Sequence, residues 1–289
     1  MLRALLKTMR PKQWTKNAFV FAALIFDEKL FQPAPLLKTS LAFAAFCLIS
    51  GAVYLINDLV DVEKDRQHPT KRLRPLPSGE LSPQVALAAA IFFMIVSLPV
   101  AYWLDGLFSA ILFGYLLLMI AYSFWLKHIP IIDVLTIATG FVLRVGAGVT
   151  VVDVARFSPW LYVCTTLLAL FLGVSKRRQE LVLLGDNAGE HRGILNHYNL
   201  KFMDELIALV TSTTIIAYAL YTFSAPNLPP NHTMMLTVPF VMYGIFRYLY
   251  LIHVRGETGA PDELLLKDRP LFAAIALWGL AVVAILYLS

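Results

Sequence analysis

The chain has 289 residues, of which 58% are hydrophobic and only 15% are charged, and its formal net charge is +5. Its mean hydropathy is +0.69. A soluble globular domain is nearer half apolar and carries more charge, so this composition excludes a soluble enzyme. The modest positive charge is also too small and too dispersed for a nucleic-acid surface. Uncharged runs long enough to cross a bilayer, at ~20 residues each, predict an all-α polytopic membrane protein.

Nine spans are predicted, and together they form one integral-membrane domain over residues 1–289. Residues 1–16 precede them, and we expect this segment to lie at the membrane interface. The first span is the weakest, because only ten uncharged residues separate Lys16 from Asp27. The predicted ranges are 17–32, 39–60, 84–104, 107–126, 131–152, 158–175, 206–224, 234–252 and 270–288.

The distribution of Lys and Arg predicts the orientation. With the N-terminus inside, the inner segments contain nineteen of these residues and the outer loops three. Positive residues favour the cytoplasmic side, so the N-terminus is expected to be cytoplasmic in a bacterial inner membrane. The long inner loops are predicted at about 61–83, 176–205 and 253–269, and we expect the chemistry on that side.

The stretch LINDLVDVEKD, residues 55–65, ends the second predicted span with a group of acids. Asn57, Asp61 and Asp65 are spaced at i, i+4 and i+8, which places them on one face of a continuing helix. Asp58 lies one residue further round the same helix. Such oxygen ligands suit Mg²⁺, which takes one or two carboxylates together with phosphate and water. We interpret Asn57, Asp61 and Asp65 as metal ligands, and Asp58, Asp61 and Asp65 as catalytic. A solvated acidic helix end is the plainer alternative.

A basic run that includes Lys71, Arg72 and Arg74 follows the acids directly. Residues of this kind also mark the inner side of membrane proteins. Beside a metal site, however, they would clamp the oxygens of a diphosphate whose charge the metal neutralises. We therefore assign Lys71 and Arg74 to a substrate diphosphate bound with Mg²⁺.

The segment NDLVDVEKD resembles the Asn-Asp-x-x-Asp-x-x-x-Asp motif of the UbiA superfamily of intramembrane prenyltransferases, and HPTKRLRPLPSGELS resembles the stretch that follows it there. The resemblance implies nine transmembrane helices around a central cavity that opens to the cytoplasmic side. It makes a homotrimer conceivable, although no interface can be identified. Family members usually carry a second acidic motif after the sixth span. Here that loop begins with three basic residues, and Asp186 and Glu190 come late.

Six further stretches resemble one branch of this family. That branch transfers 5-phosphoribose from phosphoribosyl pyrophosphate to a polyprenyl phosphate such as decaprenyl phosphate, releases pyrophosphate, and serves cell-wall synthesis. The stretches are RPKQWTKN (10–17), YSFWLKH (122–128), IDVLTIATGFVLRVGAG (132–148), SKRRQEL (175–181), HRGILNHY (191–198) and PDELLLKDRPL (261–271).

The branch resemblance implies roles for the basic residues near the inner face. The donor carries a 5-phosphate separate from its diphosphate, and this group needs cations. We expect Lys176, Arg177 and Arg178 to bind it, with Tyr122 and Lys127 opposite.

Further cations are candidates for binding phosphate. Lys16, like Arg10, precedes the first predicted span at about the depth of a lipid phosphate. Arg144 lies within the fifth predicted span, where an unpaired cation is costly. Asp133 and Asp153 are more than two helical turns away along the same helix, so phosphate binding is favoured over a structural ion pair.

Two alternatives stay open. A UbiA-type prenyltransferase would move a prenyl group from a prenyl diphosphate to an aromatic or other acceptor, using Asp186 and Glu190 in a second site. A transporter could also line its pathway with polar residues, but transporters often contain internal repeats, and none is evident here. The sequence does not fix the length of the lipid.

Overall fold

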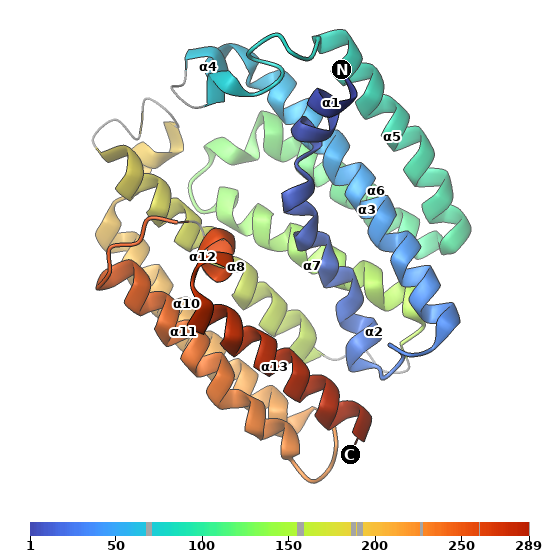
Figure 1. Ribbon diagram of the computed structural model, residues 1–289, viewed down its shortest axis with the longest axis vertical. Helices are drawn as coiled ribbons and strands as arrows, with labels where there is room; N and C mark the ends of the chain where they lie inside the picture. Colours follow the sequence, from blue (N-terminus) through green and yellow to red (C-terminus); the bar gives the residue numbers. More distant parts are fainter. Residues whose placement is uncertain are drawn as a thin grey trace. The chain divides into compact units, whose positions relative to one another are not determined.

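A computed structural model of the protein describes residues 1–67, 71–154, 159–185, 189, 193–225, 228–259 and 261–288. It confirms the all-α class, since these residues form α-helices and 3₁₀ helices and no strands. Among them, eight helices are long and apolar enough to cross a membrane. The chain divides into two compact units, residues 1–155 and 156–289, whose helices are labelled in Figure 1. The single domain expected from the sequence stays a prediction.

Unit 1 contains short helices at its start and four long ones. Its elements are α1 (Leu2–Met9), the 3₁₀ helix η1 (Pro11–Phe21), α2 (Ala22–Phe26), α3 (Pro33–Val60), α4 (Val62–Gln67), η2 (Lys71–Leu73), α5 (Pro83–Leu104), α6 (Gly106–Phe124), η3 (Leu126–His128) and α7 (Ile132–Val152). Local signals set the helix ends. Ser82 caps α5 by accepting a hydrogen bond from the Val85 N–H at 3.3 Å, as an N-cap serine does. Asp105 follows α5 and caps α6, accepting from the Phe108 N–H at 2.7 Å. A single residue therefore joins two spans.

The first predicted span, residues 17–32, is not one helix. It consists of η1, α2 and a turn, so the predicted count of nine spans is not confirmed. Within η1, buried Asn17 donates to Ser50 Oγ of α3 at 3.1 Å. The backbone also approaches α7 closely, because a Cβ on Gly148 would lie only 2.1 Å from the Val20 carbonyl oxygen. Only glycine permits this contact, which holds η1 against α7.

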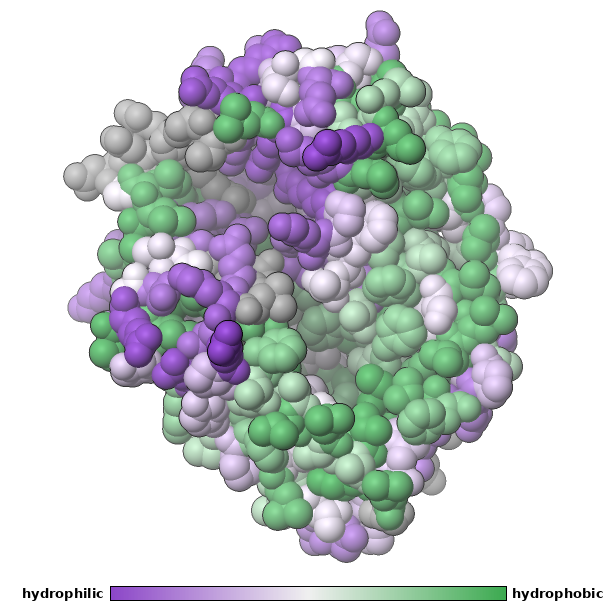
Figure 2. All heavy atoms as spheres, viewed as in Figure 1, coloured by the Kyte–Doolittle hydropathy of each residue, from purple (hydrophilic) through white to green (hydrophobic). Residues whose placement is uncertain are grey.

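Helix α3 lies at the centre of unit 1 and packs against α5, α6 and α7. The Phe46 ring of α3 lies 6.0 Å from Phe108 and 5.4 Å from Tyr115, both on α6. On the face of α5 that points away from α3, apolar side chains such as Leu87 and Phe92 are exposed. In Figure 2, hydrophobic residues cover this flank, and hydrophilic residues gather over α4 and the end of unit 1 where α1 lies. The apolar flank is what a lipid-facing helix requires.

Unit 2 contains the remaining helices. They are α8 (Pro159–Leu184), η5 (Gly193–His197), α10 (Leu200–Ser224), η6 (Thr233–Thr237), α11 (Val238–His253), α12 (Pro261–Lys267) and α13 (Arg269–Leu288). Helix α8 packs along α10, and α11 along α13. Arg247 on α11 donates to both carboxylate oxygens of Asp268, at 3.1 and 2.8 Å. These hydrogen bonds lower the pKa of the Asp268 carboxyl below its ordinary value.

The predicted inner segment 176–205 is helical over much of its length, because α8 continues to Leu184 and α10 already begins at Leu200; its position on the inner side stays a prediction. The charges after Ser175 mark the end of the apolar run. They do not end the helix, since Lys, Arg, Gln, Glu and Leu all favour helical conformation.

Candidate active site

The predicted acidic motif lies where α3 passes into α4. Asp61, between the two helices, donates its backbone N–H to the Asn57 carbonyl at 3.0 Å, and Asp65 donates to the Asp61 carbonyl at 2.8 Å. The helical turn therefore continues across the joint. Asp58 and Asp65 are buried, with 1% and 3% exposure, whereas Asn57 and Asp61 are half-buried. The register assumed from the sequence is present through Asp65.

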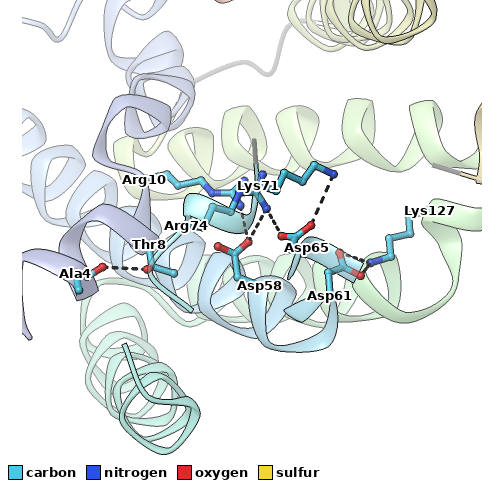
Figure 3. A network of polar contacts seen from close by, with 9 residues as sticks. All are labelled: Ala4, Thr8, Arg10, Asp58, Asp61, Asp65, Lys71, Arg74 and Lys127. Carbon is cyan, nitrogen blue, oxygen red and sulfur yellow. Dashed lines mark hydrogen bonds and ion pairs between the residues drawn. The ribbon is translucent and has the colours of Figure 1, made fainter. Parts of the chain in front are cut away.

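The side chains group differently from the prediction. Arg74 Nη1 lies 3.3 Å from Asp58 Oδ1 and 2.6 Å from Asp65 Oδ2, so these two acids share one cation. Asp61 instead accepts from Lys127 Nζ with both oxygens, at 2.7 and 2.8 Å. Figure 3 shows the two arrangements side by side. Helix geometry explains the difference. Side chains seven residues apart on a helix, such as Asp58 and Asp65, differ in direction by only about 20°, whereas side chains four residues apart, such as Asp61 and Asp65, differ by about 40°. Asp58, which was expected to lie off the face of Asp65, therefore shares Arg74 with it.

Arg10 belongs to this site, although the sequence suggested a lipid phosphate for it. Its Nη2 donates to Asp58 Oδ1 at 2.5 Å, and its guanidinium lies 4.7 Å from the centroid of the Tyr54 ring. Arg10 ends α1 in the left-handed conformation, with φ 53°, which is uncommon for a residue other than glycine. Pro11 follows it, and helices usually end before a proline. This proline was the signal that the chain turns here.

Four cations therefore surround three acids, and we call the two groups the cluster cations and the carboxylate cluster. The carboxylate cluster is Asp58, Asp61 and Asp65; the cluster cations are Arg10, Lys71, Arg74 and Lys127. Lys71 Nζ lies 3.8 Å from Asp65 Oδ1, the longest of these contacts. The cations come from the end of α1, from the segment after α4, and from η3 (Figure 3). These seven side chains carry a net charge of plus one, which leaves positive charge available to an anionic substrate.

Two other predicted substrate-binding residues of unit 1 are not among these seven side chains. Lys16 is half-buried on η1, and Tyr122 is half-buried near the end of α6. Their roles in binding stay predictions.

Arg144 on α7 is buried, and it donates hydrogen bonds to three neutral acceptors. It donates to Asn17 Oδ1 at 2.8 Å, to the Gly140 carbonyl at 2.8 Å and to the Tyr115 hydroxyl at 2.7 Å. Its guanidinium also lies 4.6 Å from the centroid of the Tyr115 ring. These contacts tie α7 to α6 and η1. Phosphate binding by Arg144 stays a prediction, and Tyr115 is a partner that the sequence analysis missed.

The basic cluster of unit 2 lies on the extended end of α8. Arg177 is 1% exposed and pairs with Glu180 at 2.9 Å, and Arg178 pairs with Asp204 of α10 at 2.5 Å. Lys176 is exposed. The three neighbours thus have different environments, as expected when consecutive helical residues step by about 100°. The candidates for a second acidic motif lie outside the described residues: Asp186 and Glu190.

The carboxylate cluster fits a divalent cation by its chemistry. Among the described residues, no three His, Cys, Asp or Glu side chains are grouped closely enough to hold an ion as they stand. Asp61 faces Lys127, while Asp58 and Asp65 converge on one nitrogen of Arg74. Two carboxylates that already share a positive charge match the ligand set that Mg²⁺ prefers. Asp58 and Asp65, with Asp61 and Asn57 adjacent, are the residues that would hold it.

An all-helical membrane fold with a buried carboxylate cluster and a surplus of cations is typical of an integral-membrane transferase acting on phosphorylated substrates. The chain belongs to the UbiA prenyltransferase family, whose pattern matches residues 18–177, and it is an enzyme of that family.

Relatives extend the match over nearly the whole chain. A protein of Corynebacterium glutamicum is 31% identical over 98% of this chain and 87% of its own length. A protein of Mycolicibacterium smegmatis is 31% identical over 100% of this chain and 94% of its own length. Both are named decaprenyl-phosphate phosphoribosyltransferase. The solved structure of a UbiA homolog from Archaeoglobus fulgidus, bound to DMAPP and Mg²⁺, has a TM-score of 0.76 over 99% of each chain at 21% identity. This structure has the same fold.

Proposed function

We propose that this enzyme transfers 5-phosphoribose from phosphoribosyl pyrophosphate to a polyprenyl phosphate, with decaprenyl phosphate the expected acceptor, and releases pyrophosphate in a Mg²⁺-dependent reaction. The observation that carries the proposal is the group of four cations around three carboxylates. It occurs in a chain whose relatives, at 31% identity over nearly its full length, bear the name of that reaction.

In the proposed reaction, a phosphate oxygen of the acceptor bonds to the anomeric carbon of the ribose. The bond from that carbon to the pyrophosphate oxygen breaks, and pyrophosphate leaves with the electron pair. The acceptor phosphate is already anionic, so no general base is required. Catalysis then depends on positioning and on stabilising the leaving group.

The chain's own residues supply that stabilisation. Mg²⁺, when bound, neutralises charge on the diphosphate. Arg74 and Lys71 lie beside Asp65 and would bind diphosphate oxygens, and Lys127 would do so from η3. We assign the donor's 5-phosphate to the basic cluster of α8, because a second anionic group needs protein cations. The acceptor phosphate is assigned to Lys16 and Arg144.

The same proposal includes the location of the enzyme. A cytoplasmic N-terminus in a bacterial inner membrane would put the carboxylate cluster on the side where phosphoribosyl pyrophosphate is made. The distribution of Lys and Arg supports this orientation.

The decisive experiment supplies purified protein, Mg²⁺ and polyprenyl phosphate with labelled phosphoribosyl pyrophosphate. We expect labelled lipid and one pyrophosphate for each ribose transferred. The competing function is prenyl transfer, favoured by the DMAPP in the Archaeoglobus fulgidus relative. Parallel reactions therefore contain a prenyl diphosphate and an aromatic acceptor. Product in these reactions alone would reject the proposal.

A further inference from the structure

We propose that the cluster cations occupy the positions at which the carboxylate cluster would hold its metal, so that metal and diphosphate bind well only together. This inference rests on the proposed function, since it concerns how the same site receives a diphosphate. Each carboxylate already accepts a charged hydrogen bond: Asp58 from Arg10, Asp65 from Arg74, and Asp61 from Lys127.

A divalent metal that arrives alone meets unfavourable electrostatics. The position shared by Asp58 and Asp65 is taken by Arg74 Nη1, at 3.3 and 2.6 Å. A metal that binds both carboxylates must displace this nitrogen and would remain beside Arg10, 2.5 Å from Asp58. Because the seven side chains already total plus one, the metal would raise the local charge to plus three. Like charges a few ångströms apart in a partly buried site repel strongly.

A diphosphate that arrives alone meets the opposite difficulty. The cations that would bind it are engaged with acids, and two acids of the carboxylate cluster, Asp58 and Asp65, are only 1% and 3% exposed. Turning Arg74 toward a phosphate would leave Asp65 with its 3.8 Å contact to Lys71. A buried carboxylate that loses the shorter of its two ion pairs and keeps only the longer one is destabilised.

Together the two ligands remove both difficulties by exchange. The carboxylates pass from protein cations to the metal, and the released cations pass to the phosphate oxygens. Every buried charge keeps a partner throughout. The exposure of the cations, 28% for Arg10 and 31% for Arg74 against 1% for Asp58, suits this exchange, because the cations are the groups with room to move. Since coupling between two ligands is reciprocal, each should strengthen the binding of the other.

The test separates exchange from a fixed structural role by the sign of the effect. Mn²⁺ serves as a spectroscopic substitute for Mg²⁺ with oxygen ligands, and its binding to the full-length solubilised protein is measured by electron paramagnetic resonance. Arg74→Gln removes the competing cation. We expect it to bind Mn²⁺ alone about ten- to a hundredfold more tightly than the wild type, as when a charged hydrogen bond no longer has to be broken. In the presence of Mn²⁺, its affinity for pyrophosphate should fall by a similar factor.

Lys127→Gln provides a second variant on a different element, because Lys127 pairs with Asp61 alone of the carboxylate cluster. It should show the same inversion. Arg66→Gln is the matched control, since Arg66 forms an ion pair of 2.7 Å with Glu63 on α4 but both side chains are at least half exposed. It should change neither affinity.

Two results would overturn the inference. If both variants bind Mn²⁺ alone no better than the wild type, while the wild type binds Mn²⁺ with pyrophosphate, the exchange is rejected and the proposed function stands. If the wild type binds no pyrophosphate even with Mn²⁺, the proposed function fails, and the inference fails with it.

Discussion

Replacing Asp65 by asparagine removes one charge from the carboxylate cluster and keeps the size of the side chain. Arg74 Nη1 lies 2.6 Å from Asp65, and Lys71 Nζ lies 3.8 Å away. A hydrogen bond to a charged group contributes about 1.5–3 kcal/mol, and a neutral one about 0.5–1.5 kcal/mol. The Arg74 side chain is 31% exposed, so water compensates for part of the loss. We therefore expect the free energy of unfolding to fall by only about 1 kcal/mol.

Turnover should fall much further than stability. Removing one preorganised electrostatic group from an active site costs about a hundred- to a thousandfold in kcat. The assay is pyrophosphate release by solubilised protein at saturating Mg²⁺, with thermal unfolding measured on the same preparation. Glu63→Gln is the matched control, because Glu63 lies on the same helix with a 76% exposed side chain. It should keep both properties. Wild-type turnover in Asp65→Asn would refute the assignment of Asp65 to the metal site.

Three further predictions concern packing, orientation and donor binding. Gly148→Ala should lower stability by about 1–3 kcal/mol through overpacking, because its Cβ would lie 2.1 Å from the Val20 carbonyl oxygen. A Cβ on Gly146 of the same helix meets nothing within 4 Å, so Gly146→Ala should be at least as stable as the wild type, since alanine favours a helix by about 1 kcal/mol over glycine. A cysteine introduced at Ser78, before α5, should resist a membrane-impermeant thiol reagent added outside cells, and one at Leu107, after α5, should react; the reverse pattern would overturn the orientation. Single substitutions by glutamine in the basic cluster of α8 should raise the KM for phosphoribosyl pyrophosphate about ten- to a hundredfold in at least one variant, with little change in the KM for the lipid; normal donor constants in all three would remove the cluster from donor binding. The three substituted residues are Lys176, Arg177 and Arg178.

Much of the fold could be predicted from the positions of charged residues. The uncharged run before Asp105 and the run after it became α5 and α6, because an isolated acid can cap a helix between two apolar segments. The positions of charges do not give the length of a helix, since α8 continues past the end of its apolar run at Ser175 to Leu184. The same method failed over residues 17–32, where η1 packs closely against Gly148 of α7, more than a hundred positions away.

The candidate site, too, could be predicted from the sequence only in part. Spacing within one segment predicted correctly that the acids follow a continuing helical register through Asp65. It could not predict which cation each acid meets, since Arg10 is 48 positions from Asp58 and Lys127 is 66 positions from Asp61. Such pairs depend on tertiary packing, of α1 against α3 in the first case and of η3 against α6 and α7 in the second. The grouping of Asp58 with Asp65 was within reach of helix geometry alone, because a spacing of seven lies closer to whole turns than a spacing of four.

The short helix α1 has a practical consequence for anyone producing this protein. It ends at Arg10, whose guanidinium contacts Asp58, so an affinity tag or fluorescent protein fused before Met1 is separated from the carboxylate cluster by a single eight-residue helix. Bulk or charge at that end would act directly on the site through α1. Fusion partners placed after α13 are attached to a helix that contributes no residue to the carboxylate cluster or the cluster cations, and they are the better choice for expression and for reporters of activity.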